Sequence, residues 1–247
     1  VFSLYSYLVG DLHKPVLPAT AETDYERYLR TDELPSLQRP PHEQLHRDEM
    51  LFQTIHQSSE LWLKLVCFEI ETAIERIDRD AIWPAIRLLR RASDSMDLVN
   101  DNTLMLEHLA PADYHIVRNG LGHGSGFDSP GFRNLHERAP KLNDAFLAAI
   151  ARRGVDIPSL HRESSADEDL FQLSERLIDI DSRVMLWRTL HLRLVERVIG
   201  GKVIGTQGTP VEVLGRRLEV RYFPELWEVR NQLTQEAGLT GLSKPYA

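Results

Sequence analysis

The side chains in this sequence that are best able to catalyse a reaction or bind a metal are its histidines. The chain has ten histidines and one cysteine. One cysteine excludes a thiolate cluster, and a structural zinc site is not expected. His56 follows Phe52 by one helical turn, and His191 follows Trp187 by one turn. From spacing alone, each is either a core histidine hydrogen-bonded to a neighbour, the commoner case, or the single imidazole that a haem iron requires.

A second candidate site combines an arginine, a tyrosine and a glycine-rich loop. Arg118 follows Tyr114 by one helical turn and stands just before the segment LGHGSGF. A planar guanidinium and a phenol together suit a carboxylate, although a salt-bridged surface arginine would show the same spacing. Neither this loop nor the later IGTQGTP has the spacing of a P-loop or a dinucleotide-binding turn, so nucleotide binding is not expected.

The elements that must position these residues are all predicted to be helices. Apolar residues recur at helical spacing over about 43–79, 81–109, 110–119, 132–154, 168–200 and 223–238. Pro84 and Pro224 fall in first turns, where proline is tolerated. No internal repeat or linker divides these segments, so the sequence predicts an all-α, single-domain helical bundle.

Residues 1–41 are predicted to form an N-terminal arm that precedes a helical domain of residues 42–247. The arm holds a short helical candidate, DYERYLRTDELPSL, followed by the segment QRPPHEQ. Pro40 and Pro41 in that segment are expected to end one element and begin another.

Composition limits the class of protein. The chain has 247 residues, of which 42% are hydrophobic, enough for a sizeable core, and its formal charge of -8 argues against a nucleic-acid partner. Cys67, in the apolar run LWLKLVCFEI, is expected to be a buried core residue, and a lone cysteine fits a reducing compartment. No leader segment is recognised, and Lys64, Glu69 and Glu71 interrupt the longest apolar stretch. The expectation is a soluble, cytoplasmic protein with no membrane association.

Several segments together resemble the tryptophan 2,3-dioxygenase family from about Tyr25 to the last helix. They are YERYL, DEMLFQTIHQSSELWLKL, YHIVR with LGHGSGFDS, LWRTLHLRLVERVIG, the dipeptide GT, and FPELWEVR, in the order that the family uses. Such an ordered set is far more specific than one short motif. The resemblance implies a helical bundle enclosing haem b, O2 as co-substrate, and a homotetramer built as a dimer of dimers.

The resemblance also implies roles for particular residues. His191 would be the axial ligand of the haem iron, and His56 would act on the distal side, near the indole nitrogen of the substrate. Phe52 would line the indole pocket. The other implied substrate-binding residues are Tyr114 and Arg118 at the carboxylate, Ser125 and Thr206 near the ammonium group and haem, and Tyr25, Tyr28 and Leu29, which would reach the pocket of a neighbouring subunit.

The chain departs from the family pattern at several places. The family usually has a Gly/Ser-rich run after GT, whereas this chain has GTQGTPVEVL, in which Gln207 and Pro210 are expected to stiffen a loop that closes over substrate. The SGF motif normally continues with glutamine, but Asp128 follows it here. Thr103 replaces a tryptophan usually found upstream of the carboxylate-binding arginine, and the connection over 139–169 is shorter. These changes predict a divergent, biosynthetic member.

The reaction that the resemblance implies is the O2-dependent 2,3-cleavage of the indole ring of L-tryptophan, or of a substituted tryptophan, to an N-formylkynurenine-type product. One alternative on the same fold is a haem monooxygenase, or a hydroxylase that uses H2O2, acting on a tryptophan or tyrosine derivative in secondary metabolism. The product would then be an oxindole or hydroxylated compound. A non-catalytic haem sensor is a further alternative, but a sensor has little use for an amino-acid-binding pair such as Tyr114 and Arg118.

Overall fold

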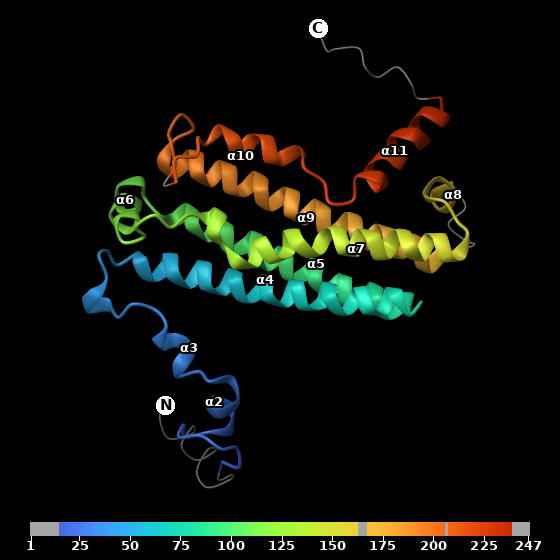
Figure 1. Cartoon of the computed structure of the whole chain (residues 1–247). Coiled ribbons are helices and arrows are strands. Elements are labelled where there is room, and N and C mark those ends of the chain that lie inside the picture. The colour runs from blue at the N-terminus through green and yellow to red at the C-terminus, as the bar shows by residue number, and fades with distance from the viewer. Residues whose placement is uncertain (1–14, 163–166, 206, 239–247) are drawn as a thin grey trace, which may run out of the picture.

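Long helices dominate the computed structural model, which describes residues 15–162, 167–205 and 207–238. Four of them run side by side as an elongated bundle (Figure 1): α4 (Glu49–Asp78), α5 (Ile82–Met105), α7 (Pro130–Arg153) and α9 (Glu168–Ile199). The shorter helices of the domain are α6 (Pro111–Asn119), α8 (Ile157–Arg162), α10 (Glu212–Arg216) and α11 (Pro224–Glu236). Within the described ranges no strand forms, and the β-type pairing is one isolated bridge between Ile204 and Pro210. The predicted all-α, single-domain fold is confirmed.

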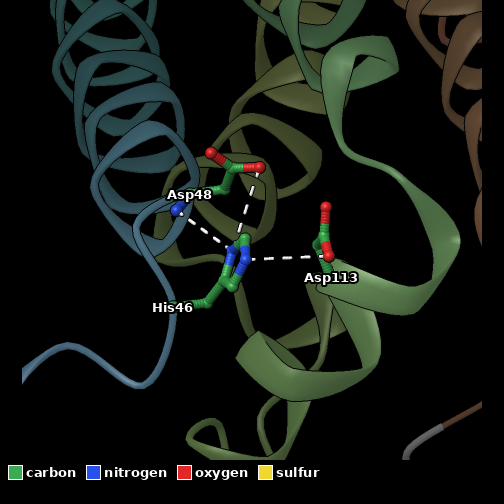
Figure 2. Close-up of side chains that lie close together, drawn as sticks. All are labelled: His46, Asp48 and Asp113. Carbon is green, nitrogen blue, oxygen red and sulfur yellow. Dashed lines mark hydrogen bonds and ion pairs between the residues drawn. The ribbon is translucent and has the colours of Figure 1, made fainter.

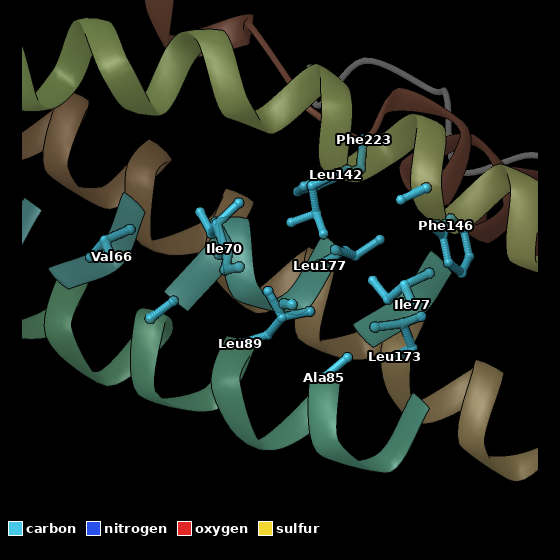
Figure 3. Packing of buried hydrophobic residues seen from close by; sticks show 14 of the residues in the cluster. Val66, Ile70, Ile77, Ala85, Leu89, Leu142, Phe146, Leu173, Leu177 and Phe223 are labelled. Atoms are coloured by element: carbon cyan, nitrogen blue, oxygen red, sulfur yellow. The ribbon is translucent and has the colours of Figure 1, made fainter. Parts of the chain in front are cut away.

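The main core lies where α4, α5, α7 and α9 face one another, and Figure 3 shows its centre. Apolar residues three and four positions apart place one face of each helix inside the bundle. On α4 the buried face carries Val66, Ile70 and Ile77, none of which is accessible to solvent. Burying one such side chain contributes about 1.5 to 3 kcal/mol. Cys67 is buried at the edge of this core, as expected, and burial raises its thiol pKa to about 11.

A smaller cluster of buried side chains lies near the other end of the bundle. It joins the start of α4 to the short 3-10 turn η2 (Leu106–His108) and to the last turns of α9. Its buried members are Ile55, Leu106, Leu109, Leu194 and Val198, and partly buried neighbours that pack against them include Phe52 and Tyr114. Two of the predicted site residues therefore lie together in this second cluster.

The arm extends away from the bundle before α4 (Figure 1). The single helical candidate is in fact two short helices, α2 (Asp24–Leu29) and α3 (Glu33–Ser36), because Arg30 adopts a left-handed conformation with φ of 55° that ends α2. Polar contacts anchor the end of the arm to α4: the Arg39 amide donates to Gln53 Oε1 at 2.9 Å, and Arg39 Nη1 lies 2.9 Å from Glu49 Oε1.

The C-terminal helix is anchored by a buried carboxylate. Asp181 of α9 is inaccessible to solvent, and its Oδ2 accepts a hydrogen bond from Trp227 Nε1 at 2.8 Å. The backbone amide of Tyr222 donates to Oδ1 at 3.1 Å. These bonds attach the start of α11 to α9, since a buried carboxylate is stable only when its oxygens accept hydrogen bonds.

Other differences from the predicted helices concern boundaries and short elements. The first long helix begins at Glu49 instead of about Glu43, because a 3-10 turn over Pro41–Glu43 and then a bend and a turn over 45–48 precede it. Helices α8 and α10 were not predicted. Among the described residues, no helix combines the length and the apolar character needed to cross a membrane.

Candidate functional site

The first turns of α4 hold Phe52 and His56 against each other. Their ring centroids are 4.0 Å apart. His56 Nδ1 lies 2.7 Å from the Phe52 carbonyl oxygen, which can only accept, so Nδ1 carries the proton and Nε2 keeps a free lone pair. Desolvation lowers the pKa of His56, and the Phe52 carbonyl opposes this only in part. A neutral imidazole with an available acceptor nitrogen is the result.

His191 lies on α9 beside an aromatic stack. Its ring is 5.0 Å from that of Trp187 with an interplanar angle of 6°, and Phe132 of α7 lies 3.7 Å from Trp187 between ring centroids. Burial lowers the pKa of His191 to about 4, and the charge of protonated His56 adds to this effect. His191 is therefore neutral at pH 7, the state in which an imidazole can bind a metal.

Helix α6 contributes the predicted carboxylate-binding pair. The Tyr114 ring lies 6.3 Å from that of Phe52 between centroids, which places the phenol beside the start of α4. Desolvation raises the pKa of Tyr114, so its hydroxyl is protonated at neutral pH and can donate, although the charge of Arg118 lowers this pKa in part. Within the described residues Arg118 has no ion-pair partner, and its guanidinium is available to an external anion.

The glycine-rich loop after α6 approaches His191. A Cβ atom added at Gly126 would lie 3.7 Å from His191 Nε2, so the absence of a side chain keeps the space beside this nitrogen free. Ser125 caps the 3-10 turn η3 (Gly126–Asp128): its Oγ accepts from the Phe127 amide at 3.3 Å, and its own amide donates to Asp128 Oδ2 at 3.0 Å.

The second glycine loop, residues 203–211, contacts the first. Gln207 Nε2 donates to Asp128 Oδ2 at 2.7 Å and lies 3.3 Å from the His123 carbonyl oxygen. Gln207 and Asp128 are two of the positions at which the sequence departs from the family pattern, and no spacing in the sequence indicated that they meet. Thr206, the neighbour of Gln207, lies outside the described residues.

One end of the bundle thus gathers most of the predicted site: Phe52 and His56 of α4, Tyr114 and Arg118 of α6, Ser125 of the first glycine loop and His191 of α9. The arm residues lie apart from it, with Tyr25 68%, Tyr28 78% and Leu29 46% exposed on α2. Thr103 is buried in α5, and its hydroxyl donates to the Val99 carbonyl of the preceding turn at 2.9 Å.

Two observations fit a haem at His191. The imidazole is neutral, yet in the described parts of the chain no hydrogen-bond partner contacts it, so its ring nitrogens are free. Gly126 approaches this ring closely, since a Cβ atom added there would lie 3.7 Å from Nε2, and a larger side chain would crowd this nitrogen. A neutral imidazole without a hydrogen-bond partner among the described residues is a suitable haem ligand.

A group of metal-type side chains lies nearby, between the segment before α4 and helix α6 (Figure 2). His46 Nε2 is 3.6 Å from Asp113 Oδ1, and His46 Nδ1 is 3.9 Å from Asp48 Oδ2 and accepts from the Asp48 amide at 3.3 Å. The imidazole therefore links the two segments. Because Tyr114 follows Asp113 directly, this link lies next to the predicted carboxylate-binding pair.

The chain is similar to proteins of known name over most of its length. A sequence profile of the family described as tryptophan 2,3-dioxygenase matches residues 13–146 and 141–233. A tryptophan 2,3-dioxygenase from Bacillus thuringiensis (strain Al Hakam) is 35% identical over 85% of this chain and 92% of its own length. Similar proteins of the same name come from Saccharopolyspora erythraea, 32% identical over 86% of this chain and 93% of the relative, and Caulobacter vibrioides, 34% identical over 85% and 98%.

The relatives also carry segments that this chain lacks. The alignment with the Bacillus protein spans 260 positions, although only 85% of the 247 residues take part. The two matched segments meet at 141–146, within the 139–169 region expected to be shortened. With both segments together covering nearly the whole helical domain, the chain belongs to the tryptophan 2,3-dioxygenase family.

Proposed function

We propose that this chain catalyses the reaction for which its relatives are named, the O2-dependent 2,3-cleavage of the indole ring of L-tryptophan or a substituted tryptophan, using haem b with His191 as the axial ligand. The observation that carries the proposal is the grouping of Phe52, His56 and Tyr114 at the end of the bundle that holds His191, beside the Arg118 guanidinium, which has no ion-pair partner among the described residues. Family membership supplies the reaction class.

The amino-acid part of the substrate binds at helix α6. Arg118 pairs with the carboxylate, and the protonated hydroxyl of Tyr114 donates a second hydrogen bond. Ser125 and Thr206 are proposed to lie near the ammonium group and the haem. This binding energy positions the substrate, because a carboxylate held at two points fixes where the indole ring lies.

The indole ring packs against Phe52, and its N–H donates to His56 Nε2. His56 can accept this bond because its proton is on Nδ1, directed at the Phe52 carbonyl. With a lowered pKa, His56 orients the indole and is not a strong base. When bound, haem supplies the redox-active iron at which O2 is activated.

The assembly and location follow the same reasoning. We propose a homotetramer, arranged as a dimer of dimers, in which the arm of one subunit brings Tyr25, Tyr28 and Leu29 to the pocket of a neighbour. The high exposure of these three apolar side chains on α2 supports an intermolecular role. A cytoplasmic location agrees with the free, buried Cys67.

The experiment that tests the reaction is mass analysis of the product formed from L-tryptophan under 18O2. Ring cleavage retains both labelled atoms, whereas the same-fold monooxygenase or peroxide-dependent hydroxylase would retain one or none. The relatives found carry the name of the ring-cleaving enzyme, so the hydroxylase alternative is not favoured. A spectral response to tryptophan without any product would indicate the sensor instead.

A further inference from the structure

The two glycine loops are joined by a hydrogen bond between two residues that each depart from the family pattern. Asp128 Oδ2 accepts from Gln207 Nε2 at 2.7 Å and from the Ser125 amide at 3.0 Å. We call the Asp128–Gln207 pair the loop clasp. A glutamine at the position of Asp128 and a glycine or serine at that of Gln207, as the family pattern has them, could not form this bond between a carboxylate and a side-chain amide.

The surroundings of the Gln207 side chain show which atom of its amide donates in the loop clasp. The amide nitrogen of Gln207 faces two acceptors, the Asp128 carboxylate and the His123 carbonyl oxygen 3.3 Å away. Only an NH2 group satisfies both, so the orientation of this side-chain amide is fixed by its surroundings. The acceptor at Asp128 is charged, which strengthens the bond relative to a neutral pair.

A second contact joins the same parts of the chain. The guanidinium of Arg217, which follows α10, lies 4.7 Å from the ring centroid of Phe127 in the first glycine loop. Between these two contacts, loop 203–211 closes on itself: the Gly205 amide donates to the Thr209 carbonyl at 2.8 Å, and the Val211 amide to the Val203 carbonyl at 3.2 Å. The loop is thus a defined turn attached to the first loop near Ser125.

We propose that Asp128 and Gln207 are positioning residues that hold loop 203–211 against the first glycine loop before substrate arrives. The inference rests on the proposed function, in which Ser125 and Thr206 lie beside the substrate. Asp128 accepts from both the Ser125 amide and Gln207 Nε2, so one carboxylate links the first glycine loop at Ser125 to the second loop. The loop is preorganised by the chain itself, and less of the substrate's binding energy is needed to close it.

The test begins with hydrogen exchange of loop 203–211 in the substrate-free holoenzyme. Q207E places a carboxylate opposite Asp128 and the His123 carbonyl, so the loop should open more often and its amides should exchange about 3- to 10-fold faster. The double variant D128N/Q207E removes the repulsion between the two carboxylates, although it does not restore the contact with the His123 carbonyl, so exchange should return part of the way toward the wild-type rate. The matched control is Q235E, which adds the same charge at an exposed glutamine on α11.

The kinetic arm measures L-tryptophan turnover by the same four proteins. Q207E should raise KM about 3- to 10-fold with a smaller change in kcat, D128N/Q207E should recover part of the difference, and Q235E should match the wild type. A residue with a merely structural role would not give a KM effect that removing the second carboxylate partly rescues.

The outcomes separate the two proposals. Unchanged exchange in Q207E, or faster exchange that D128N/Q207E leaves uncorrected, overturns the loop clasp whatever the substrate is. If hydrogen exchange follows the expected pattern but the KM for L-tryptophan does not change, the loop clasp exists but does not position the loop for substrate. A wild-type holoenzyme that neither binds nor converts tryptophan overturns the proposed function, while the exchange data alone decide on the loop clasp.

Discussion

Removing the Arg118 guanidinium should weaken tryptophan binding without weakening the fold. Arg118 is partly buried on α6, and among the described residues it forms no ion pair that the fold would lose. The substitution Arg118→Ala should therefore leave the free energy of unfolding within about 0.5 kcal/mol of the wild type. Its effect should appear only when a carboxylate must be bound.

The size of the effect follows from the surroundings of Arg118. An exposed ion pair contributes about 0 to 1 kcal/mol, whereas breaking a desolvated, hydrogen-bonded pair costs about 2 to 5 kcal/mol. The neighbouring Tyr114 is desolvated enough to have a raised pKa, and Arg118 itself keeps partial access to solvent. We expect a loss of about 2 to 3 kcal/mol, which is roughly a 30- to 150-fold weaker affinity for tryptophan.

The assay is a double-mutant cycle read by haem absorbance. Wild type and Arg118→Ala are each titrated with L-tryptophan and with tryptamine, which lacks the carboxylate, and the four affinities give the coupling energy directly. Arg118→Lys should give an intermediate loss, because it keeps the charge but not the planar pair of donors. Arg87→Ala, an exposed arginine on α5, is the control and should change none of the affinities.

A coupling energy within error of zero would refute this reasoning. Arg118 would then not bind the carboxylate, and the case for an amino-acid substrate would rest on family membership alone. An equal loss for tryptophan and tryptamine would likewise place the effect of Arg118 on the protein and not on the substrate carboxylate.

Four further predictions concern single residues. His191→Ala should purify with little haem, measured as Soret absorbance per protein, and normal loading with an unchanged spectrum would contradict axial ligation. His56→Ala should keep its haem and lose about 1 to 3 kcal/mol of transition-state stabilisation, measured as kcat/KM. Loss of haem in this variant would mean that His56, and not His191, binds the haem iron. In the apo-protein, burial holds the pKa of His191 near 4, below the ordinary histidine value of about 6.5, so the unfolded state takes up a proton first and the free energy of unfolding should fall as the pH is lowered from about 6.5 towards 4. Urea denaturation at several pH values should show a shallower fall in His191→Ala. Asp181→Ala should lower the free energy of unfolding by about 3 kcal/mol, because the donors of Tyr222 and Trp227 lose their buried acceptor, and an unchanged urea midpoint would contradict this.

The long helices could be predicted from the sequence because each repeats its apolar pattern over many turns. Helix α9 has 32 residues, so errors at single positions do not hide its period. The break at Arg30 could not be predicted, since a left-handed arginine carries no glycine signal. Helices α8 and α10 are too short to show a period, and the latter contains Gly215.

Spacing along one helix predicted which side chains share a face, such as Phe52 with His56 and Trp187 with His191. It could not predict which helices meet, because that depends on packing between distant segments. The loop clasp joins positions 79 residues apart in the chain, and each of its members was interpreted separately as a departure from the family. The stack of Phe132 on Trp187 was missed for the same reason.

The two hydrophobic clusters differ in size, so the two parts of the bundle should differ in how easily they unfold locally. The extensive cluster among α4, α5, α7 and α9 holds one part of the bundle, whereas five buried side chains hold the end that carries the site. Because local unfolding follows the density of buried contacts, the last turns of α9 should open at a lower free energy than its first turns. His191 lies close to that less protected part, so we expect the haem proposed to bind there to enter by a local opening of this end while the remaining helices stay folded.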